Sequence, residues 1–549
     1  MICEVAPPIG ATPEDRDFLL SEARKIESNL FPKFADILND FHNLEFNQRY
    51  WKILTGHWFR YTTEMLVNRI YTIKTCFDQY NIEAVSTYGC SIEILPQSNY
   101  TDSIMKANNE IWNSTLYEKI IDLLIQKPPK LEKITINPME ELDRKEQIPK
   151  SHKLSKENVY TNSRKIARKF LHDTDAFIVN SYLPLSKEFL LEAILGQFPQ
   201  WFISPEFKSQ NTPDTLARAN AGSKLEINTS GDIERAVSIL LFCLIPLDYF
   251  EDYVQLNDLA NAQDWPKKPK FIFTSNNFAS DDVFKAWTAK MVVDGTKYIV
   301  GQHGAGYGTD KYEFPTIEEV SSDAFITWGW TRPVNSYQPG FVFKNASRRK
   351  KMLRGGKLLL IEEPQIPRIS LWEQADKFLK YLDEQFTFLG NLEAEVYDNV
   401  LVRLSINNHN MWSEEKLHFK NFDQNLEIDN GLHPIRELWP QSRVVVHSYN
   451  STGLLETLEA NIPTLAFWQN GLTHLVDEAI PAYLLLVQAG IVHLSPESTA
   501  QKVNEIWDHV DSWWWSSEVQ NARREFCSQY ARTSNKPVRE LRKILLENI

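Results

Sequence analysis

One segment, residues 442–468, combines the residue types that a phosphate-binding site needs. It reads SRVVVHSYNSTGLLETLEANIPTLAFW, so a valine-rich strand passes through a polar run into a helical leucine pattern. Ser or Thr is preferred just before a helix, where exposed amides and the positive dipole end attract anions. The candidate ligand-binding residues here are Asn450, Ser451, Thr452, Gly453, which would let a ligand approach closely, and Glu456, which could reach ribose hydroxyls. The alternative is an ordinary capped helix, because the segment has neither a Walker loop nor a G-x-G-x-x-G fingerprint.

A second segment, residues 301–308, places a histidine in a loop rich in glycine. Its sequence GQHGAGYG has four glycines in eight residues and follows a predicted strand that ends at Val300. Glycines let the backbone press against a ligand, and histidine titrates near neutral pH. His303 is therefore a candidate for general acid catalysis or for contact with a phosphate, with Gln302 and Gly304 as candidate ligand contacts. A histidine whose hydrogen bonds are satisfied within a tight turn is the alternative.

Charged residues near predicted strand ends complete the set of candidates. Asp281 and Asp282 begin a predicted helix, where a carboxylate could act as base or nucleophile, or could simply cap the helix. Arg403 ends a predicted strand and could pair with a phosphate or a substrate carboxylate. Asp429 and His433 lie in a later loop at the same level of the predicted cleft and are weaker candidates.

The elements that must position these residues are short apolar strands that alternate with helices, a pattern typical of parallel βαβ units. The predicted strands are 176–179, 270–274, 297–300, 324–328, 357–361, 400–404, 443–446 and 464–468. Large apolar residues recur at helical spacing between about residues 13 and 80, which predicts N-terminal helices, and the tail from about residue 499 is also predicted to be helical. A Pro- and charge-rich stretch at residues 128–156 is predicted to be a surface excursion.

The sequence therefore predicts an α/β protein with two Rossmann-like domains that face a cleft, with added helices at both ends. Residues 1–335 would hold the N-terminal helices and a first domain that carries the glycine-rich loop. Residues 336–357, which include a basic cluster at 348–351, would be a linker, and residues 358–549 a second domain with the C-terminal helices. Ligands of open parallel sheets bind at the carboxyl ends of the strands, so the cleft is the expected site.

Composition excludes several classes of protein. Lys plus Arg number 59 against 72 for Asp plus Glu in 549 residues, and this net charge of −13 argues against a nucleic-acid partner. The N-terminus resembles no signal peptide. The longest apolar run, residues 236–247, is shorter than the about 20 residues that span a bilayer. We expect a cytoplasmic protein with at most peripheral contact with the inner face of the membrane.

The sequence indicates no metal site. The five cysteines show no C-x-x-C spacing, which also excludes a disulfide scaffold. The D-x-D sequence at residues 173–175 precedes a predicted strand instead of following one, and no His-x-x-x-His pair accompanies it. We predict that the protein uses no metal and no other cofactor.

Five segments together resemble a known family. They are YWKILTGHW, SYLP, IVGQHGAGYG, FITWGW and the block VVVHSYNSTGLLETLEANIPTLAFW, which is the most specific of them. They resemble a bacterial family of surface-polysaccharide transferases that is similar to the retaining β-Kdo glycosyltransferases of lipopolysaccharide O-antigen and capsule synthesis. The matches run from about residue 40 to residue 470, whereas the stretch at 128–156 and the linker depart from the pattern.

The resemblance implies a GT-B-like fold and a CMP-activated 2-keto-3-deoxy sugar acid as donor, transferred with retention to a glycan or glycolipid. In such a fold, residues 1–335 would form the acceptor side and residues 358–549 the nucleotide-donor side. Ser451 and Thr452 would contact the donor phosphate, and His303 would be a catalytic histidine. Retention implies a carboxylate nucleophile, for which Asp281 and Asp282 are the candidates by position. Two other functions fit the same cleft: a nucleotide-sugar epimerase or hydrolase, and a nucleotide-binding protein without catalysis.

Overall fold

The computed structural model describes most of the chain from residue 9 onward. The described ranges are 9–10, 12–133, 167–227, 229–334, 336–345, 356–363, 375–404, 414–431, 433–468 and 471–549. The predicted surface excursion at residues 128–156 is described only as far as Lys133, and the basic cluster at 348–351 lies outside the described residues. Both remain predictions.

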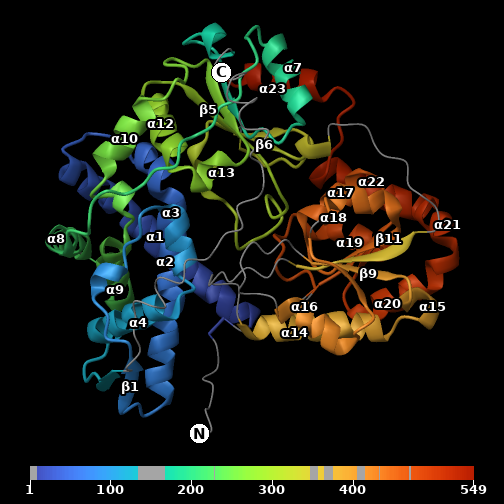
Figure 1. Ribbon diagram of the computed structural model, residues 1–549, viewed down its shortest axis with the longest axis horizontal. Helices are drawn as coiled ribbons and strands as arrows, with labels where there is room; N and C mark the ends of the chain where they lie inside the picture. Colours follow the sequence, from blue (N-terminus) through green and yellow to red (C-terminus); the bar gives the residue numbers. More distant parts are fainter. Residues whose placement is uncertain are drawn as a thin grey trace.

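Two separate parallel sheets form the centres of two α/β domains, which confirms the predicted fold class (Figure 1). The strand orders of these two sheets are β3-β4-β5-β6-β7 and β10-β9-β8-β11-β12-β13, and β1 (Ala84–Thr87) and β2 (Lys130–Lys133) form a separate two-stranded sheet. The first sheet consists of β3 (Phe177–Val179), β4 (Phe271–Thr274), β5 (Lys297–Gly301), β6 (Ala324–Thr327) and β7 (Tyr337–Pro339). The second consists of β8 (Lys357–Ile361), β9 (Val400–Arg403), β10 (Glu427–Asp429), β11 (Ser442–His447), β12 (Thr464–Phe467) and β13 (Val492–His493). The central strands are buried along nearly all their length, which accounts for their continuous apolar sequences.

The order of strands in the second sheet reverses between β8 and β11. The chain proceeds from β8 to β9 and β10 on one side, and from β11 to β12 and β13 on the other. Connections that leave two such strands diverge, and the resulting crevice is where open α/β sheets bind ligands. Helix α18 (Thr452–Glu459) begins soon after β11, so its first turn lies at this reversal point.

Two long N-terminal helices belong to the first domain, as the periodicity predicts (Figure 1). They are α1 (Pro13–His42) and α2 (Gln48–Gln79). Helix α2 packs against α12 (Asp282–Val293) and α13 (Ile317–Ser321), both of which flank the first sheet. The aromatic side chains of Trp51 and Trp58 on α2 are fully buried, so they belong to the core.

The C-terminal segment returns to the first domain, so the predicted second domain at residues 358–549 is too long. Helix α22 (Ser517–Tyr530) packs against α18 and α19 (Ile480–Gln488), whereas α23 (Pro537–Glu547) packs against α7 (Leu185–Ile194) beside the first sheet (Figure 1). Leu541 and Leu545 of α23 are fully buried in the same apolar cluster as Phe271 and Ile299. An amphipathic pattern shows that a helix has a partner but not which one.

The second chain crossing between the domains lies beside the described start of the first. The first crossing follows β7, a strand of the first sheet that the prediction placed in the linker at residues 336–357. The second crossing lies between α22 and α23 and contains Arg532. The Val342 N–H donates to the Arg532 carbonyl at 2.9 Å, and the Arg532 N–H donates to the Trp328 carbonyl at 2.8 Å. Backbone hydrogen bonds therefore connect the second crossing to the first.

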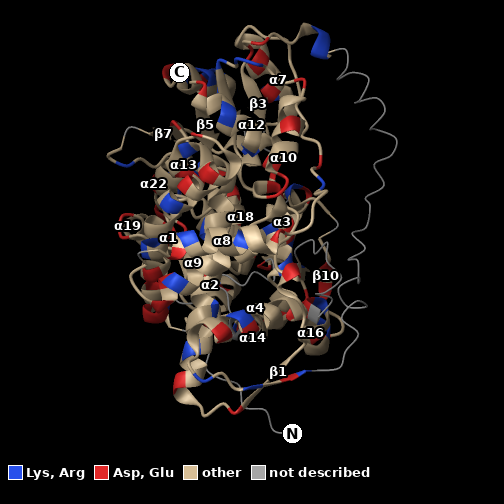
Figure 2. Ribbon diagram, turned by 90° about the vertical axis from the view of Figure 1, so that its left-hand side faces the viewer, with Lys and Arg blue, Asp and Glu red and all other residues tan. Residues whose placement is uncertain are grey.

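Within the described ranges, no helix is both long enough and apolar enough to cross a bilayer. On the side of the molecule drawn in Figure 2, acidic and basic residues are interspersed over the helices.

The return of α23 predicts that a C-terminal substitution destabilises the N-terminal half. Leu541→Ala should lower the free energy of unfolding by about 2–5 kcal/mol, because it leaves a cavity in the first domain's core. Hydrogen exchange should accelerate in β4 and β5 more than in β8 and β11. Ile549→Ala, at a half-exposed side chain, is the control and should change stability by less than about 0.5 kcal/mol. Faster exchange in the second sheet instead would contradict the assignment of α23.

Candidate active site

The glycine-rich loop of the first domain meets the start of α18 in the second. The loop follows β5, and its Ala305 N–H donates a hydrogen bond of 2.9 Å to Thr452 Oγ1. A Cβ at position 304 would lie 2.9 Å from the same oxygen, so the approach requires Gly304. The structure therefore brings together the two segments that the sequence singled out.

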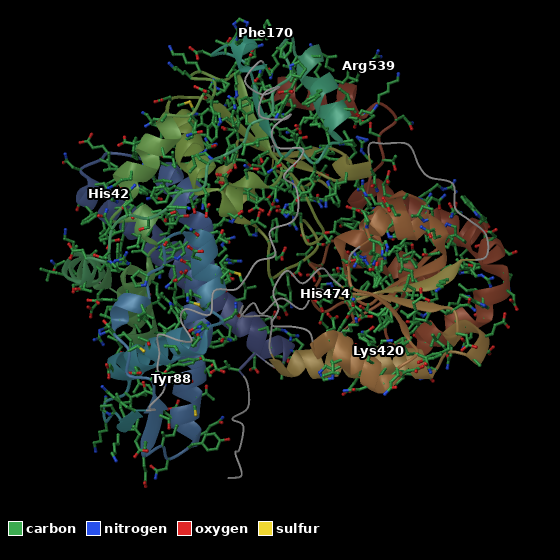
Figure 3. All side chains as sticks on the ribbon, in the orientation of Figure 1. His42, Tyr88, Phe170, Lys420, His474 and Arg539 are labelled. Atoms are coloured by element: carbon green, nitrogen blue, oxygen red, sulfur yellow. The ribbon has the colours of Figure 1, made fainter. Side chains whose placement is uncertain are left out.

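A second set of hydrogen bonds supports this contact. Asn450 Nδ2 lies 3.0 Å from His474 Nε2, and its Oδ1 accepts from the Tyr483 hydroxyl at 3.1 Å. The His474 carbonyl in turn accepts from the Lys311 N–H of the first domain at 3.0 Å. Figure 3 shows His474 at the edge of the second domain that faces the first. Asn450, predicted to bind the donor, thus holds a residue of the domain interface.

The first turn of α18 is closed by a cap, as predicted. Ser451 Oγ accepts from the Leu454 N–H at 3.0 Å and lies 3.3 Å from His447 Nδ1. Burial lowers the pKa of His447 to about 3, so this imidazole is neutral at pH 7. A Cβ at position 453 would lie 2.9 Å from His447 Cε1, so packing against this ring already requires Gly453.

His303 lies in an aromatic environment beside the domain interface. Its ring stacks on Tyr182 with centroids 5.9 Å apart, and the Phe278 ring lies 5.7 Å away. Its Nδ1 is 3.0 Å from the Tyr307 hydroxyl oxygen. Burial, and then the charge of Lys344, lower the pKa of His303 to about 4, so the ring is neutral at pH 7. A neutral imidazole can accept a proton, which favours the role of base over that of acid.

Gln302 fixes the glycine-rich loop through buried hydrogen bonds. Its Oε1 accepts from the Trp328 N–H at 2.8 Å and from the Trp330 indole at 2.9 Å, while its Nε2 donates to the Gly304 carbonyl at 2.9 Å. The side chain is almost fully buried, so the structure gives it a role in fixing the loop.

Glu456 and Arg403 are both occupied by protein partners. Glu456 Oε1 lies 3.5 Å from Lys344 Nζ, and its Oε2 lies 3.5 Å from Arg436 Nη2, so this carboxylate pairs with two cations. Arg403 donates to the Leu404 carbonyl at 2.6 Å, and it also donates to the carbonyls of Gly431 and His433.

The weaker candidates Asp429 and His433 were predicted to share a loop, but Asp429 is the last residue of β10 and His433 follows it. Arg403 Nε lies 3.5 Å from Asp429 Oδ2, and His433 Nδ1 lies 3.4 Å from Asp429 Oδ1. These contacts connect Arg403, at the end of β9, to the segment after β10, where its guanidinium donates to backbone carbonyls.

Asp281 caps α12. It accepts from the Phe284 N–H at 2.9 Å, from Ser204 Oγ at 2.5 Å and from Asn277 Nδ2 at 2.6 Å. Three accepted hydrogen bonds stabilise the carboxylate in this position, where it supports Asn277. The cap was one of the two interpretations that the sequence left open.

Asp282 forms a buried ion pair with Lys285. Its Oδ1 lies 2.6 Å from Lys285 Nζ and accepts from the Tyr249 hydroxyl at 2.5 Å, and its Oδ2 accepts from the Tyr100 N–H at 3.4 Å. These bonds direct the carboxylate toward Tyr249 and Lys285, so we do not assign it as a nucleophile.

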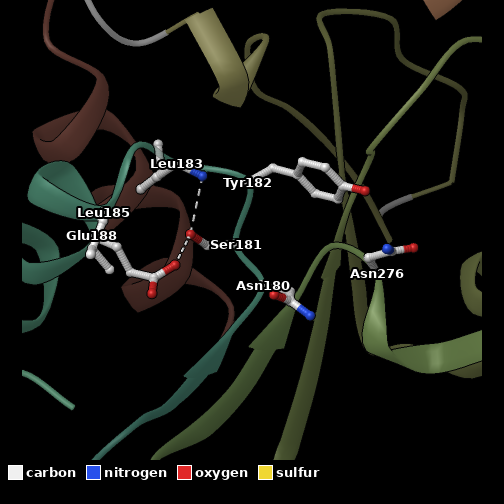
Figure 4. A pocket seen from close by; sticks show the side chains of 7 residues that line it. All are labelled: Asn180, Ser181, Tyr182, Leu183, Leu185, Glu188 and Asn276. Atoms are coloured by element: carbon white, nitrogen blue, oxygen red, sulfur yellow. Dashed lines mark hydrogen bonds between the residues drawn. The ribbon is translucent and has the colours of Figure 1, made fainter. Parts of the chain in front are cut away.

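A pocket of about 340 Å³ opens at the carboxyl ends of β3 and β4 (Figure 4). It is lined by Asn180, Ser181, Tyr182, Leu183, Leu185, Glu188 and Asn276. Tyr182 connects it to His303, because the same ring lines the pocket and stacks on the imidazole. Asn180 and Tyr182 have φ of +46° and +61°, a left-handed conformation that costs free energy in residues with a Cβ.

Sequence reasoning missed three residues around His303: Tyr182, Tyr307 and Glu318. Tyr307 donates a hydrogen bond to Glu318 Oε1 while it contacts His303. Tyr307 could have been suggested by its place in the glycine-rich loop. Glu318 follows a helix start marked by a capping box at Thr316, but nothing in the sequence relates it to His303. Among the described residues, no group of His, Cys, Asp and Glu could hold a metal ion.

Solved structures similar to this chain share little sequence with it. A proposed UDP-N-acetylglucosamine 2-epimerase from Listeria monocytogenes is 9% identical over 66% of this chain and 100% of its own, with a TM-score of 0.38. A variant of the wall teichoic acid polymerase TagF soaked with CDPG is 10% identical over 71% and 94%, with a TM-score of 0.35. A mutant O-GlcNAc transferase from Thermobaculum terrenum is 10% identical over 99% and 98%, with a TM-score of 0.34. TM-scores this low say nothing about activity.

A comparison with curated proteins finds no match. In contrast, the model of the family described as LIC12162 family transferase matches residues 2–545, nearly the whole chain. The chain therefore belongs to the LIC12162 family of transferases.

Proposed function

We propose that this transferase is a glycosyltransferase that moves a sugar from a nucleotide donor to a glycan or glycolipid acceptor. The observation that supports this most is the hydrogen bond of 2.9 Å from Ala305 to Thr452 Oγ1. It joins the loop that carries His303 to the start of α18. A proton acceptor on one domain therefore lies close to an anion-favouring helix start on the other.

The donor phosphate binds at the first turn of α18. This turn lies at the strand-order reversal between β8 and β11, where open sheets bind ligands. The amides of Thr452 and Gly453 and the Thr452 hydroxyl supply hydrogen-bond donors, and the helix dipole supplements them. They stabilise the charge that develops on the phosphate as the sugar departs.

The acceptor hydroxyl binds beside His303, next to the pocket lined by Tyr182. In the acceptor step, the hydroxyl proton moves to the imidazole and the hydroxyl oxygen bonds to the anomeric carbon. The bond from that carbon to its leaving group breaks, and the electron pair remains on the leaving group. The aromatic face of Tyr182 and the amides of Asn180 and Asn276 suit a sugar ring with its hydroxyls.

The donor that we propose is a CMP-linked, Kdo-like sugar acid, and the acceptor is a surface polysaccharide or lipopolysaccharide. This proposal derives from the resemblance of the block from Val444 to Trp468 to such transferases. Retention stays a prediction, because Asp281 and Asp282 are engaged elsewhere and no other nucleophile is assigned. The two alternative functions can be distinguished by donor turnover. An epimerase or hydrolase would turn over the nucleotide-sugar donor without an acceptor, whereas a nucleotide-binding protein would not turn over the donor at all.

The first prediction concerns His303. The wild type should release CMP from a CMP-linked sugar acid only when an acceptor is present. His303→Ala should lower kcat by about 10²–10⁴-fold, because the acceptor loses its base. Because the pKa of His303 is about 4, wild-type kcat/KM should stay constant with falling pH until about pH 5 and then decline. Unchanged turnover in the variant would remove this role from His303.

The second prediction concerns nucleotide choice. In a thermal-stability screen of CMP, UDP, GDP and CDP, CMP should stabilise the protein most, by about 2.7 kcal/mol at about 100 times its Kd. Thr452→Val should weaken this stabilisation, because it removes a hydroxyl from the helix start. Thr387→Val, at a partly exposed threonine of the second domain, is the matched control. Equal stabilisation of the wild type and of Thr452→Val by CMP would place the nucleotide elsewhere.

The third prediction concerns metals. We expect CMP release to be unchanged after treatment with EDTA, because amides and hydroxyls at α18 balance the phosphate charge. If EDTA treatment abolished turnover and added magnesium restored it, a bound cation would be balancing the phosphate charge instead.

A further inference from the structure

A buried series of polar side chains extends from His303 into the N-terminal helices. His303 Nδ1 lies 3.0 Å from the Tyr307 hydroxyl oxygen, and that hydroxyl donates to Glu318 Oε1. The other oxygen of Glu318 lies 3.6 Å from Nε2 of His57, which belongs to α2. Tyr307 and Glu318 are each about 95% buried, so water cannot replace these partners freely.

The number of hydrogens fixes the direction of these bonds. Tyr307 has one hydroxyl hydrogen, which goes to the Glu318 carboxylate, an acceptor only. The Tyr307 oxygen must therefore accept at its contact with His303, so Nδ1 of His303 carries the proton. In a neutral imidazole the other nitrogen, Nε2, then has a free electron pair.

We propose that Tyr307 and Glu318 are positioning residues that hold His303 in the tautomer whose Nε2 accepts the acceptor's proton. The inference rests on the proposed role of His303 as base and specifies how that role is prepared. When Nε2 takes the proton, the Nδ1–H bond to Tyr307 stays in place, and the carboxylate behind it stabilises the positive charge. Neither residue touches the substrate in this account.

The charged groups around His303, Tyr307 and Glu318 affect the protonation of each of these side chains. The charge of Lys344, on the connection after β7, disfavours protonation of His303 before an acceptor arrives. Burial raises the pKa of Tyr307, and the nearby carboxylates Glu318, Glu313 and Glu319 raise it further, so the hydroxyl keeps its hydrogen. Burial raises the pKa of Glu318 above its ordinary value, and the hydrogen bond from Tyr307 and the charge of Arg60 offset only part of this rise.

Helix α2 covers the end of this series of polar side chains that lies at Glu318 and His57. The His57 ring stacks on Phe278 with centroids 5.4 Å apart, and Phe278 lies beside His303. Burial, and then the charge of Lys285, lower the pKa of His57, so it stays neutral and adds no positive charge beside Glu318. The N-terminal helices thus exclude water from the carboxylate that orients the base.

The direct test is the tautomer of His303 in the full chain without substrate. Two-bond ¹⁵N–¹H spectra of histidine-labelled protein distinguish the tautomers, and His303→Gln identifies the signal. We expect the Nδ1–H form in the wild type and a shift toward the Nε2–H form in Tyr307→Phe and in Glu318→Gln. Tyr253→Phe removes another buried hydroxyl, which hydrogen-bonds Tyr50, and should leave the signal unchanged. The Nε2–H form in the wild type, or no shift in either variant, would overturn the proposal.

Kinetics separate this inference from the proposed function. With a CMP-linked donor, Tyr307→Phe and Glu318→Gln should each lower kcat by about 10- to 100-fold with KM unchanged, less than His303→Ala. Unchanged kcat in both variants would overturn the proposal even if the tautomer shifts. If the wild type turns over no donor, the proposed function fails, while the tautomer still decides whether Tyr307 and Glu318 orient His303.

Discussion

The contact between Gly304 and Thr452 is the constraint on which the arrangement of the two domains depends. The backbone of one domain lies so close to a side chain of the other that a Cβ at position 304 would reach 2.9 Å from Thr452 Oγ1. The hydrogen bond beside it contributes only about 1 kcal/mol. Most of the stabilisation comes from the apolar cluster behind it, which joins Tyr307 and Trp328 of the first domain to Leu454 and Tyr483 of the second. The hydrogen bond therefore fixes which residues of the two domains lie opposite each other, and the apolar cluster supplies most of the stabilisation.

The sheets could be predicted from the sequence because buried parallel strands carry continuous apolar runs between helices. β7, β10 and β13 have only two or three residues each and are not buried along their whole length, so they lack the continuous apolar run that made the equally short β3 predictable. The destination of α23 could not be predicted either. Its apolar face shows that it packs, but which domain receives it depends on distant residues such as Phe271.

The candidate site was predictable at the level of segments more than of side chains. The glycine-rich loop and the start of α18 do meet, because both follow strands at ligand-binding edges of their sheets. Arg403 and Asp281 also lie at element ends, yet hydrogen bonds direct them to backbone groups and neighbouring side chains. No sequence pattern predicts the conformation of the chain between Tyr307 and Glu318. The contact between these two side chains can therefore be recognised only in the structure.

The paired crossings at Val342 and Arg532 restrict how the two halves of the molecule can move. A single flexible tether would permit twisting and sliding in any direction. Two crossings that are joined by backbone hydrogen bonds restrict the twisting of one domain against the other more than a single crossing would. This restriction favours one relative orientation of the loop that carries His303 and the start of α18.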